Sequence, residues 1–167
     1  EFQDQASNPG LDLYPADQRE EIDELNSWIY PSINNGVYRC GFAKKQQAYS
    51  QAFNELFSAL NRVEAILSNS RYLAGQNLTE ADVRLFTTLV RFDAVYVTHF
   101  KCNMKRIVDY PNIWGYTRDI YQIHGIADTV NMNHIKRHYY ESHLHINPFG
   151  IVPDGPLIDL TSPHGRG

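Results

Sequence analysis

The chain has 167 residues, of which 43% are hydrophobic, and a net charge of -4. This length suits one domain with a hydrophobic core and is too short for two. The acidic balance, with no cluster of basic residues, gives no electrostatic reason to expect binding to nucleic acid or to an anionic membrane.

The first predicted elements are a lead-in over residues 1–13 and a helix after it. Asn8, Pro9 and Gly10 favour an irregular lead-in, which we interpret as the remnant of a linker. Pro15 suits the first turn of a helix, and apolar residues then recur at helical spacing: Ile22, Leu25, Trp28 and Ile29.

The stretch after Pro31 has two interpretations. Asn35 and Gly36, set between apolar residues, form the strongest short signal for a β-hairpin. The flanking residues do not alternate as strands do, and Pro31 can kink a helix without ending it. We therefore predict a kinked helix that continues to about Cys40.

Two further helices are predicted, with a loop over residues 71–77 between them. The first covers about residues 45–69, where apolar residues recur at intervals of three and four. The second begins after Thr79 and runs to about His99. Thr79 and Asp82 form a capping box, and Leu78 and Val83 are placed as a hydrophobic staple. Because apolar residues surround most of this helix, we expect it to be buried at the centre of the fold; Arg84, Arg91 and Asp93 exclude a membrane span.

The rest of the chain is predicted to form a connection, more helices and a tail. Residues 101–109 are the connection, and Pro111 begins a helix whose inward residues are Ile113, Trp114, Tyr116, Ile120 and Tyr121. Short helices follow at about residues 126–130 and 132–141. Six prolines and glycines from Pro148 to Pro163 prevent further helix. The sequence thus indicates an all-α domain over residues 14–143 and an extended tail over residues 144–167.

Cysteine and histidine are the first candidates for chemistry. Cys40 and Cys102 are too few for a disulfide framework and nothing resembles a signal peptide, so we expect a reducing, cytoplasmic setting. Either thiol could be a nucleophile, but we interpret both as buried structural residues. A zinc site at His134, His138, His143 and His145 is conceivable, but the spacing fits no closed structural site. We therefore predict no metal.

The 11 tyrosines are the third candidates. Tyr38 lies in the kinked segment, and Tyr139 and Tyr140 lie at the end of the last helix. A phenol can donate to and accept from a substrate oxygen while its ring packs on a flat ligand. Spacing alone does not separate this role from packing in the core.

The chain resembles a known family at this point. The capped helix at Leu78–Asp82 and the order of the helices are similar to the all-helical C-terminal domain of glutathione transferases. Three denser stretches, residues 33–43, 91–103 and 134–155 with its Ile146-Asn147-Pro148, resemble the glutathionyl-hydroquinone reductases, which are the Xi class of these transferases. The resemblance covers about residues 11–165.

The resemblance implies a glutathione-dependent reductase that converts glutathionyl-hydroquinones into hydroquinones. Carried over by position, Tyr38 is the family tyrosine that donates a proton or holds the leaving hydroquinone, and Tyr139 is the second tyrosine that bonds the quinol oxygens. The family also forms homodimers through the helical domain.

The resemblance also implies a part that this sequence does not match. The family's catalytic cysteine, in a Cys-Pro-Trp-Ala stretch, and its glutathione site belong to an N-terminal thioredoxin-like domain that would precede Glu1. We therefore expect this chain to be the substrate-binding and dimerisation half, which is inactive alone. Glutathione is then bound mainly by the N-terminal domain, and we assign no cofactor-binding residue in this chain. Two alternatives stay open: an omega-like transferase domain, and a non-catalytic transferase-like module that binds proteins.

Overall fold

The computed structural model describes residues 10–166, which form helices and irregular segments. The only extended pairing in this range is an isolated bridge between Tyr72 and Gly75. The first nine residues of the predicted lead-in lie outside the described residues. No described helix has the length and apolar character needed to cross a membrane.

The first helical rod is continuous but changes its winding at Pro31. It consists of α1 (Arg19–Ile29), a π-helical segment (Tyr30–Asn34) and α2 (Gly36–Gly41). Pro31 has no N–H to donate to the carbonyl of Ser27, which interrupts the α-helical bonding there. Within the segment, Asn35 N donates to Tyr30 O across five residues, at 2.8 Å. The predicted kinked helix is confirmed.

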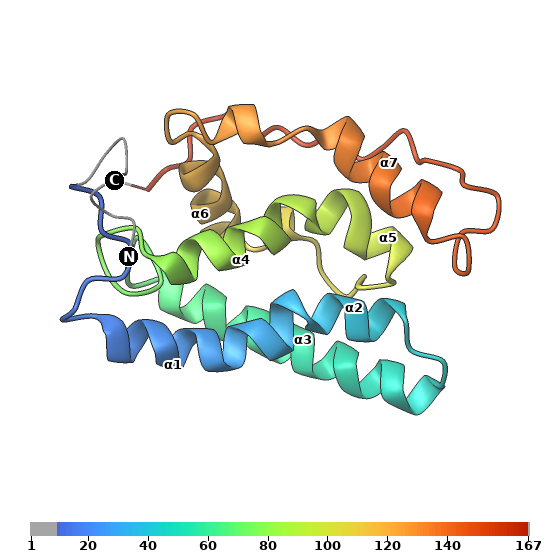
Figure 1. The fold of residues 1–167 in the computed structure, drawn as a ribbon, viewed down its shortest axis with the longest axis horizontal. Helices are drawn as coiled ribbons and strands as arrows, with labels where there is room; N and C mark the ends of the chain where they lie inside the picture. The colour runs from blue at the N-terminus through green and yellow to red at the C-terminus, as the bar shows by residue number, and fades with distance from the viewer. Residues whose placement is uncertain (1–9, 167) are drawn as a thin grey trace.

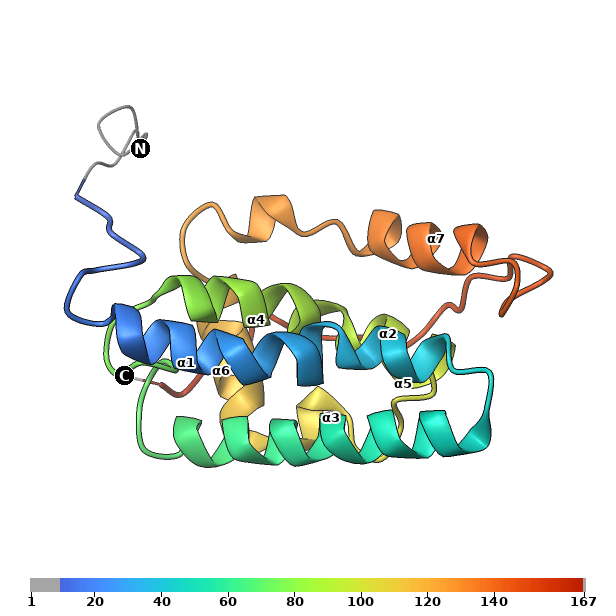
Figure 2. The same cartoon turned by 60° about the horizontal axis from the view of Figure 1, so that its bottom comes forward.

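The start of this rod differs from the prediction. Helix α1 begins at Arg19, because Gln18 N donates to Pro15 O at 3.0 Å and closes a separate turn at Pro15. The next helix, α3 (Gln46–Leu67), confirms the predicted helix at residues 45–69 and packs along α2. Figure 2 shows α1 and α2 end to end beside α3.

Helix α4 (Glu80–Arg91) occupies the centre of the fold, as predicted (Figure 1). Its capping box forms, and Asp82 Oδ2 accepts from the backbone N–H and the hydroxyl of Thr79 at 2.8 and 2.9 Å. The outer face of the helix is not buried, since Val83 is 39% exposed. A second π-helical segment (Phe92–Tyr96) and α5 (Val97–His99) continue α4, and all five residues of that segment are buried.

The remaining elements wrap around α4. A 3-10 turn (Ile107–Asp109) precedes α6 (Pro111–Tyr121), and another (Ala127–Thr129) precedes α7 (Met132–Ser142). The largest fully buried side chains come from helices and from the connections between them: Phe57, Phe92, Phe100, Tyr110 and Tyr116.

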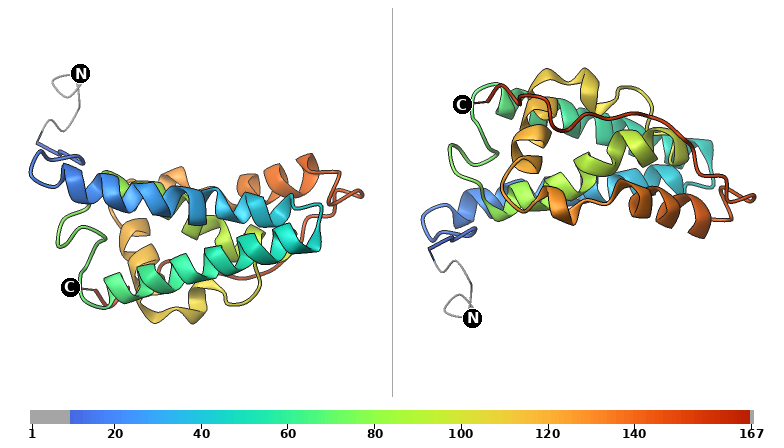
Figure 3. Two further views of the ribbon diagram at one scale, coloured as in Figure 1. Left: turned by 90° about the horizontal axis from the view of Figure 1, so that it is seen from below. Right: turned by 90° about the horizontal axis from the view of Figure 1, so that it is seen from above.

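The tail after α7 contains no helix up to residue 166, as predicted, and it crosses the molecule back toward the end of α3 (Figure 3). Arg166 anchors it there, because its Nη2 donates to Leu67 O at 2.9 Å and to Arg71 O at 3.0 Å. The tail lies close to α6, and a Cβ on Gly115 would be 2.9 Å from His164 O. The tail is thus a packed part of the domain.

Candidate functional site

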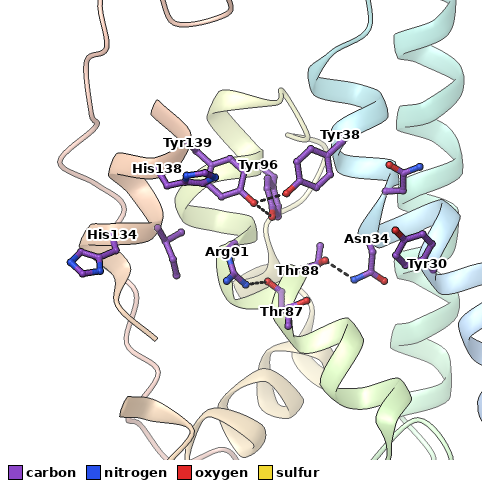
Figure 4. Close-up of a pocket in the computed structure, with 12 residues that line it drawn as sticks. Tyr30, Asn34, Tyr38, Thr87, Thr88, Arg91, Tyr96, His134, His138 and Tyr139 are labelled. Carbon is purple, nitrogen blue, oxygen red and sulfur yellow. Dashed lines mark hydrogen bonds between the residues drawn. The ribbon is translucent and has the colours of Figure 1, made fainter. Parts of the chain in front are cut away.

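Three tyrosine hydroxyls meet at one point between the first rod, the central helix and α7 (Figure 4). The Tyr38 and Tyr139 oxygens are 2.7 Å apart, and the Tyr96 oxygen is 2.8 Å from that of Tyr139. Tyr96 and Tyr139 are 2% and 6% exposed, whereas Tyr38 is half-buried. The two tyrosines singled out from the sequence are therefore neighbours, and Tyr96 joins them.

The burial of these groups gives the hydrogen-bond chain a direction. A buried hydroxyl that donates to nothing is costlier than one with an unused lone pair. On this ground we assign Tyr96 as the donor to Tyr139 and Tyr139 as the donor to Tyr38, although the distances alone fit either direction. The hydrogen of Tyr38 is then free to point into the adjoining cavity, and Tyr139 keeps one lone pair that can accept a bond.

The tyrosine pKa values agree with this direction. Burial raises the pKa of Tyr139 to about 12, while the bond to Tyr38 raises it and the bond from Tyr96 lowers it. Burial, followed by the proximity of Tyr139, raises the pKa of Tyr96 far above its ordinary range. Both groups therefore stay neutral phenols at physiological pH, and the cluster can donate and accept hydrogen bonds without carrying charge.

Local structure holds each ring in place. Tyr38 lies in α2, directly after the first π-helical segment, and Tyr96 closes the second. The Phe100 ring supports both: its centroid is 5.3 Å from that of Tyr38 and is stacked at 5.4 Å on Tyr96. Gly41 allows this support, because a Cβ there would be 2.1 Å from Phe100 Cδ1. The rings are fixed before any ligand binds.

The hydroxyls border a cavity of about 560 Å³. Its floor includes Asn34, which joins the first π-helical segment to α4 by donating to Arg84 O at 2.9 Å and to Thr88 Oγ1 at 2.8 Å. Twelve residues line the cavity: Tyr30, Asn34, Asn35, Tyr38, Thr87, Thr88, Arg91, Tyr96, His134, Ile135, His138 and Tyr139. One wall is aromatic and one is polar, which suits a flat ligand with oxygen substituents.

The other sequence candidates lie elsewhere. Tyr140 is 3% exposed and donates weakly to Ala94 O at 3.4 Å, so it belongs to the core. Cys40 and Cys102 are 2% and 0% exposed and do not line the cavity. The interaction with the neighbouring Cys102 thiol lowers the pKa of Cys40, and the interaction with Cys40, followed by burial, raises the pKa of Cys102. The sequence interpretation of buried thiols is confirmed.

The histidines divide into two groups. His134 and His138 line the cavity, whereas His143 Nδ1 is 3.1 Å from His99 Nε2, so this pair connects α7 to α5. Burial and the neighbouring His143 lower the pKa of His99 to about 4. Among residues 10–166, no three histidine, cysteine or carboxylate side chains are grouped so that they could hold a metal ion.

Sequence reasoning missed Tyr96 and Arg91 as site residues. Both fall in the stretch 91–103, which carried the family resemblance, but Tyr96 was interpreted as one more apolar residue of the central helix. A change of winding at residues 92–96 turns Tyr96 toward Tyr139, and no residue pattern in the sequence marked that change.

Comparison with known proteins shows which domains this one resembles. Residues 46–119 match the family described as glutathione S-transferase, C-terminal domain. In the structure of YqjG from Escherichia coli with glutathione bound, described as a glutathione transferase homologue, 51% of that chain superposes on 93% of this one with a TM-score of 0.92 and 58% identity. A Xi-class glutathione transferase from Natrialba magadii gives a TM-score of 0.92 at 53% identity, covering 93% of this chain and 48% of that one.

Curated relatives show the same likeness over part of their length. The chain is 59% identical over 155 residues to the glutathionyl-hydroquinone reductase YqjG of Escherichia coli, covering 93% of this chain and 47% of that protein. It is 52% identical over 159 residues to the glutathionyl-hydroquinone reductase PcpF of Sphingobium chlorophenolicum, covering 95% of this chain and 50% of that protein. The chain thus spans about half the length of these relatives.

Proposed function

The chain belongs to the C-terminal domain family of the glutathione S-transferases, and we propose that it is the substrate-binding half of a reductase that removes glutathione from glutathionyl-hydroquinones. The observation that carries this proposal is the convergence of the Tyr38, Tyr96 and Tyr139 hydroxyls on one cavity. A non-catalytic module that binds proteins needs no such cluster. The convergence therefore favours the enzyme over that alternative.

The reaction places one demand on this half of the site. A thiolate attacks the sulfur that joins glutathione to the ring, the carbon–sulfur bond breaks, and its electron pair passes to the ring. The ring carbon then takes up a proton, and a second glutathione resolves the mixed disulfide to oxidised glutathione and the free thiol. Charge on the ring and its oxygens is highest as the bond breaks, so a positioned O–H donor stabilises that state.

The tyrosine chain supplies this donor. The free hydrogen of Tyr38 donates to the ring or its oxygen, and the spare lone pair of Tyr139 accepts from a quinol hydroxyl. Tyr96 stays behind them as the buried donor that sets the direction of the chain. In this proposal the catalytic thiolate lies outside the described residues, because Cys40 and Cys102 are buried away from the cavity. Glutathione is bound mainly by the domain that carries that thiolate.

We also propose the domain arrangement and the assembly that the sequence resemblance implied. Residues 14–143 form the helical substrate-binding domain, residues 144–167 form the tail, residues 1–13 are the remnant of a linker, and two copies associate through the helical domain. Light scattering at tens of micromolar tests the assembly. A monomer at that concentration would contradict it.

Binding and turnover of glutathionyl-menadiol test the function. We expect the chain to bind this compound, and Tyr38→Phe to weaken binding by about fivefold to tenfold through loss of one hydrogen bond. Tyr121→Phe is the matched control, because Tyr121 lies on α6 away from the cavity. We expect no turnover by the chain with excess glutathione. Turnover would contradict an external nucleophile and make Cys40 the first cysteine to replace, whereas equal binding by Tyr38→Phe would contradict the site.

A further inference from the structure

No carboxylate lines the cavity. Its lining residues include Arg91, His134 and His138, and none of the twelve is Asp or Glu. A second cavity of about 310 Å³ adjoins the first and shares Thr87, Arg91, His134 and Ile135 with it. Its lining also contains no carboxylate. Arg91 therefore stands between two cavities that hold no anion to balance it.

The carboxylates that follow on α7, and those on α4 and its continuation, already have hydrogen-bond or ion-pair partners. On α7, both Glu141 oxygens accept from Arg137 Nε at 3.1 and 3.2 Å. On α4, Glu80 is 3.4 Å from Arg84, and the buried Asp93 accepts from the backbone N–H groups of residues 107 and 108. Within residues 10–166, Arg91 takes part in no ion pair; its Nη1 donates to Thr87 O, one turn back on its own helix.

Arg91 also acts on the tyrosine cluster. Its positive charge lowers the pKa of Tyr139, against the larger effect of burial. Arg91 and the three tyrosines line the same cavity, and in the view of Figure 4 the Arg91 side chain lies between the labelled Tyr139 and Thr87. A ligand that bonds the tyrosines therefore has an unpaired guanidinium beside it.

We propose that Arg91 forms an anion subsite that binds a carboxylate group of the ligand held by the tyrosines. The subsite deepens the proposed function, on which it rests, because it adds an acidic group to the description of the substrate. A guanidinium can bind a carboxylate through two parallel hydrogen bonds, and His134 at the same rim offers a further ring N–H. The carboxylate can be a substituent of the quinol ring or belong to the glutathione that the ring carries.

Two hydroquinones that differ in charge test the subsite. We expect the chain to bind 2,5-dihydroxybenzoate about tenfold more tightly than 2-methylhydroquinone, because a hydrogen bond between charged groups is worth that factor. Arg91→Met should remove this preference, so that the two compounds bind with similar affinity. Arg91→Lys should retain part of it. Arg84→Met, on the same helix but outside the lining, is the matched control.

Glutathione and its diethyl ester distinguish the source of the carboxylate. If Arg91→Met weakens only binding of glutathione and not of its ester, the subsite holds a carboxylate of the tripeptide. If Arg91→Met removes only the preference for 2,5-dihydroxybenzoate, the subsite binds a carboxylate on the quinol ring. If Arg91→Met changes the relative affinity in neither pair of compounds, the proposed subsite is wrong. The proposed function is tested separately by Tyr38→Phe. If that function is wrong, Tyr38→Phe binds 2-methylhydroquinone as tightly as the unmodified chain does.

Discussion

Replacing Tyr139 by phenylalanine tests the direction of the tyrosine chain. The substitution removes the central hydroxyl and leaves the ring in place. Tyr96, which is 2% exposed, then loses the acceptor that lies 2.8 Å from its oxygen. An unsatisfied buried hydroxyl lowers the free energy of unfolding by about 2 kcal/mol. Tyr38 is half-buried and can form a hydrogen bond to water instead, so its lost bond to Tyr139 adds little to this loss of stability.

Tyr96→Phe is the comparison that makes the test specific. It removes the buried donor itself, and Tyr139 still donates to Tyr38 at 2.7 Å. We therefore expect it to lower the free energy of unfolding by less than about 1 kcal/mol. In the double variant, the hydroxyl that Tyr139→Phe left unsatisfied is gone. The double variant should then be no less stable than Tyr139→Phe alone, which is non-additivity in a double-mutant cycle.

Urea unfolding followed by far-UV circular dichroism measures all three variants. A loss of about 2 kcal/mol lowers the midpoint by about 1 M urea for a domain of this size. The reasoning is refuted if Tyr96→Phe destabilises the chain as much as Tyr139→Phe, or if the two losses simply add. Either result would mean that Tyr96 is held by its packing on Phe100 and not by the hydroxyl chain.

Three further predictions concern stability. The pKa of His99 is about 4 in the folded state and 6.5 in the unfolded state, so the unfolded state binds more protons as the pH falls through this range. The free energy of unfolding should therefore fall by about 2 kcal/mol from about pH 7 to about pH 5. His99→Gln should flatten this dependence in urea titrations, and an unchanged slope would contradict it. Gly41→Ala should destabilise the chain by about 3 kcal/mol, because Phe100 is confined by the tyrosines, and a loss below about 1 kcal/mol in the same assay would contradict that packing. Arg166→Ala should destabilise by about 1 to 2 kcal/mol and speed protease cleavage of residues 144–166, and unchanged cleavage would mean that the tail is held elsewhere.

The helices could be predicted because their signals are local. The Thr79–Asp82 capping box lies within four residues, and the apolar periodicity of α3 runs over six turns without interruption. Pro31 marked a kink because a missing N–H is a property of the residue itself. The start of α1 was predicted too early, because Pro15 is equally compatible with the isolated turn that the fold adopts.

The candidate site could be predicted only in part. Tyr38 and Tyr139 were reached through the resemblance. They are 101 positions apart in the sequence, and nothing local indicated that their hydroxyls meet. Tyr96 and Arg91 lay inside a helix that was correctly predicted, but their roles depend on which way that helix turns. The functional assignment of all four residues stays a prediction until the variants above are measured.

The sequence by itself determined the all-α class, the order of the helices, the capped central helix and the tail, because propensity, capping and periodicity act over a few residues. Only the tertiary structure decided that three hydroxyls converge, that Tyr38 is the least buried of them, and that Arg91 forms no ion pair with a carboxylate within residues 10–166. Those properties depend on distances between α2, the continuation of α4 and α7. Such distances are set by packing and by the winding of two π-helical segments, which no local pattern of residues encodes.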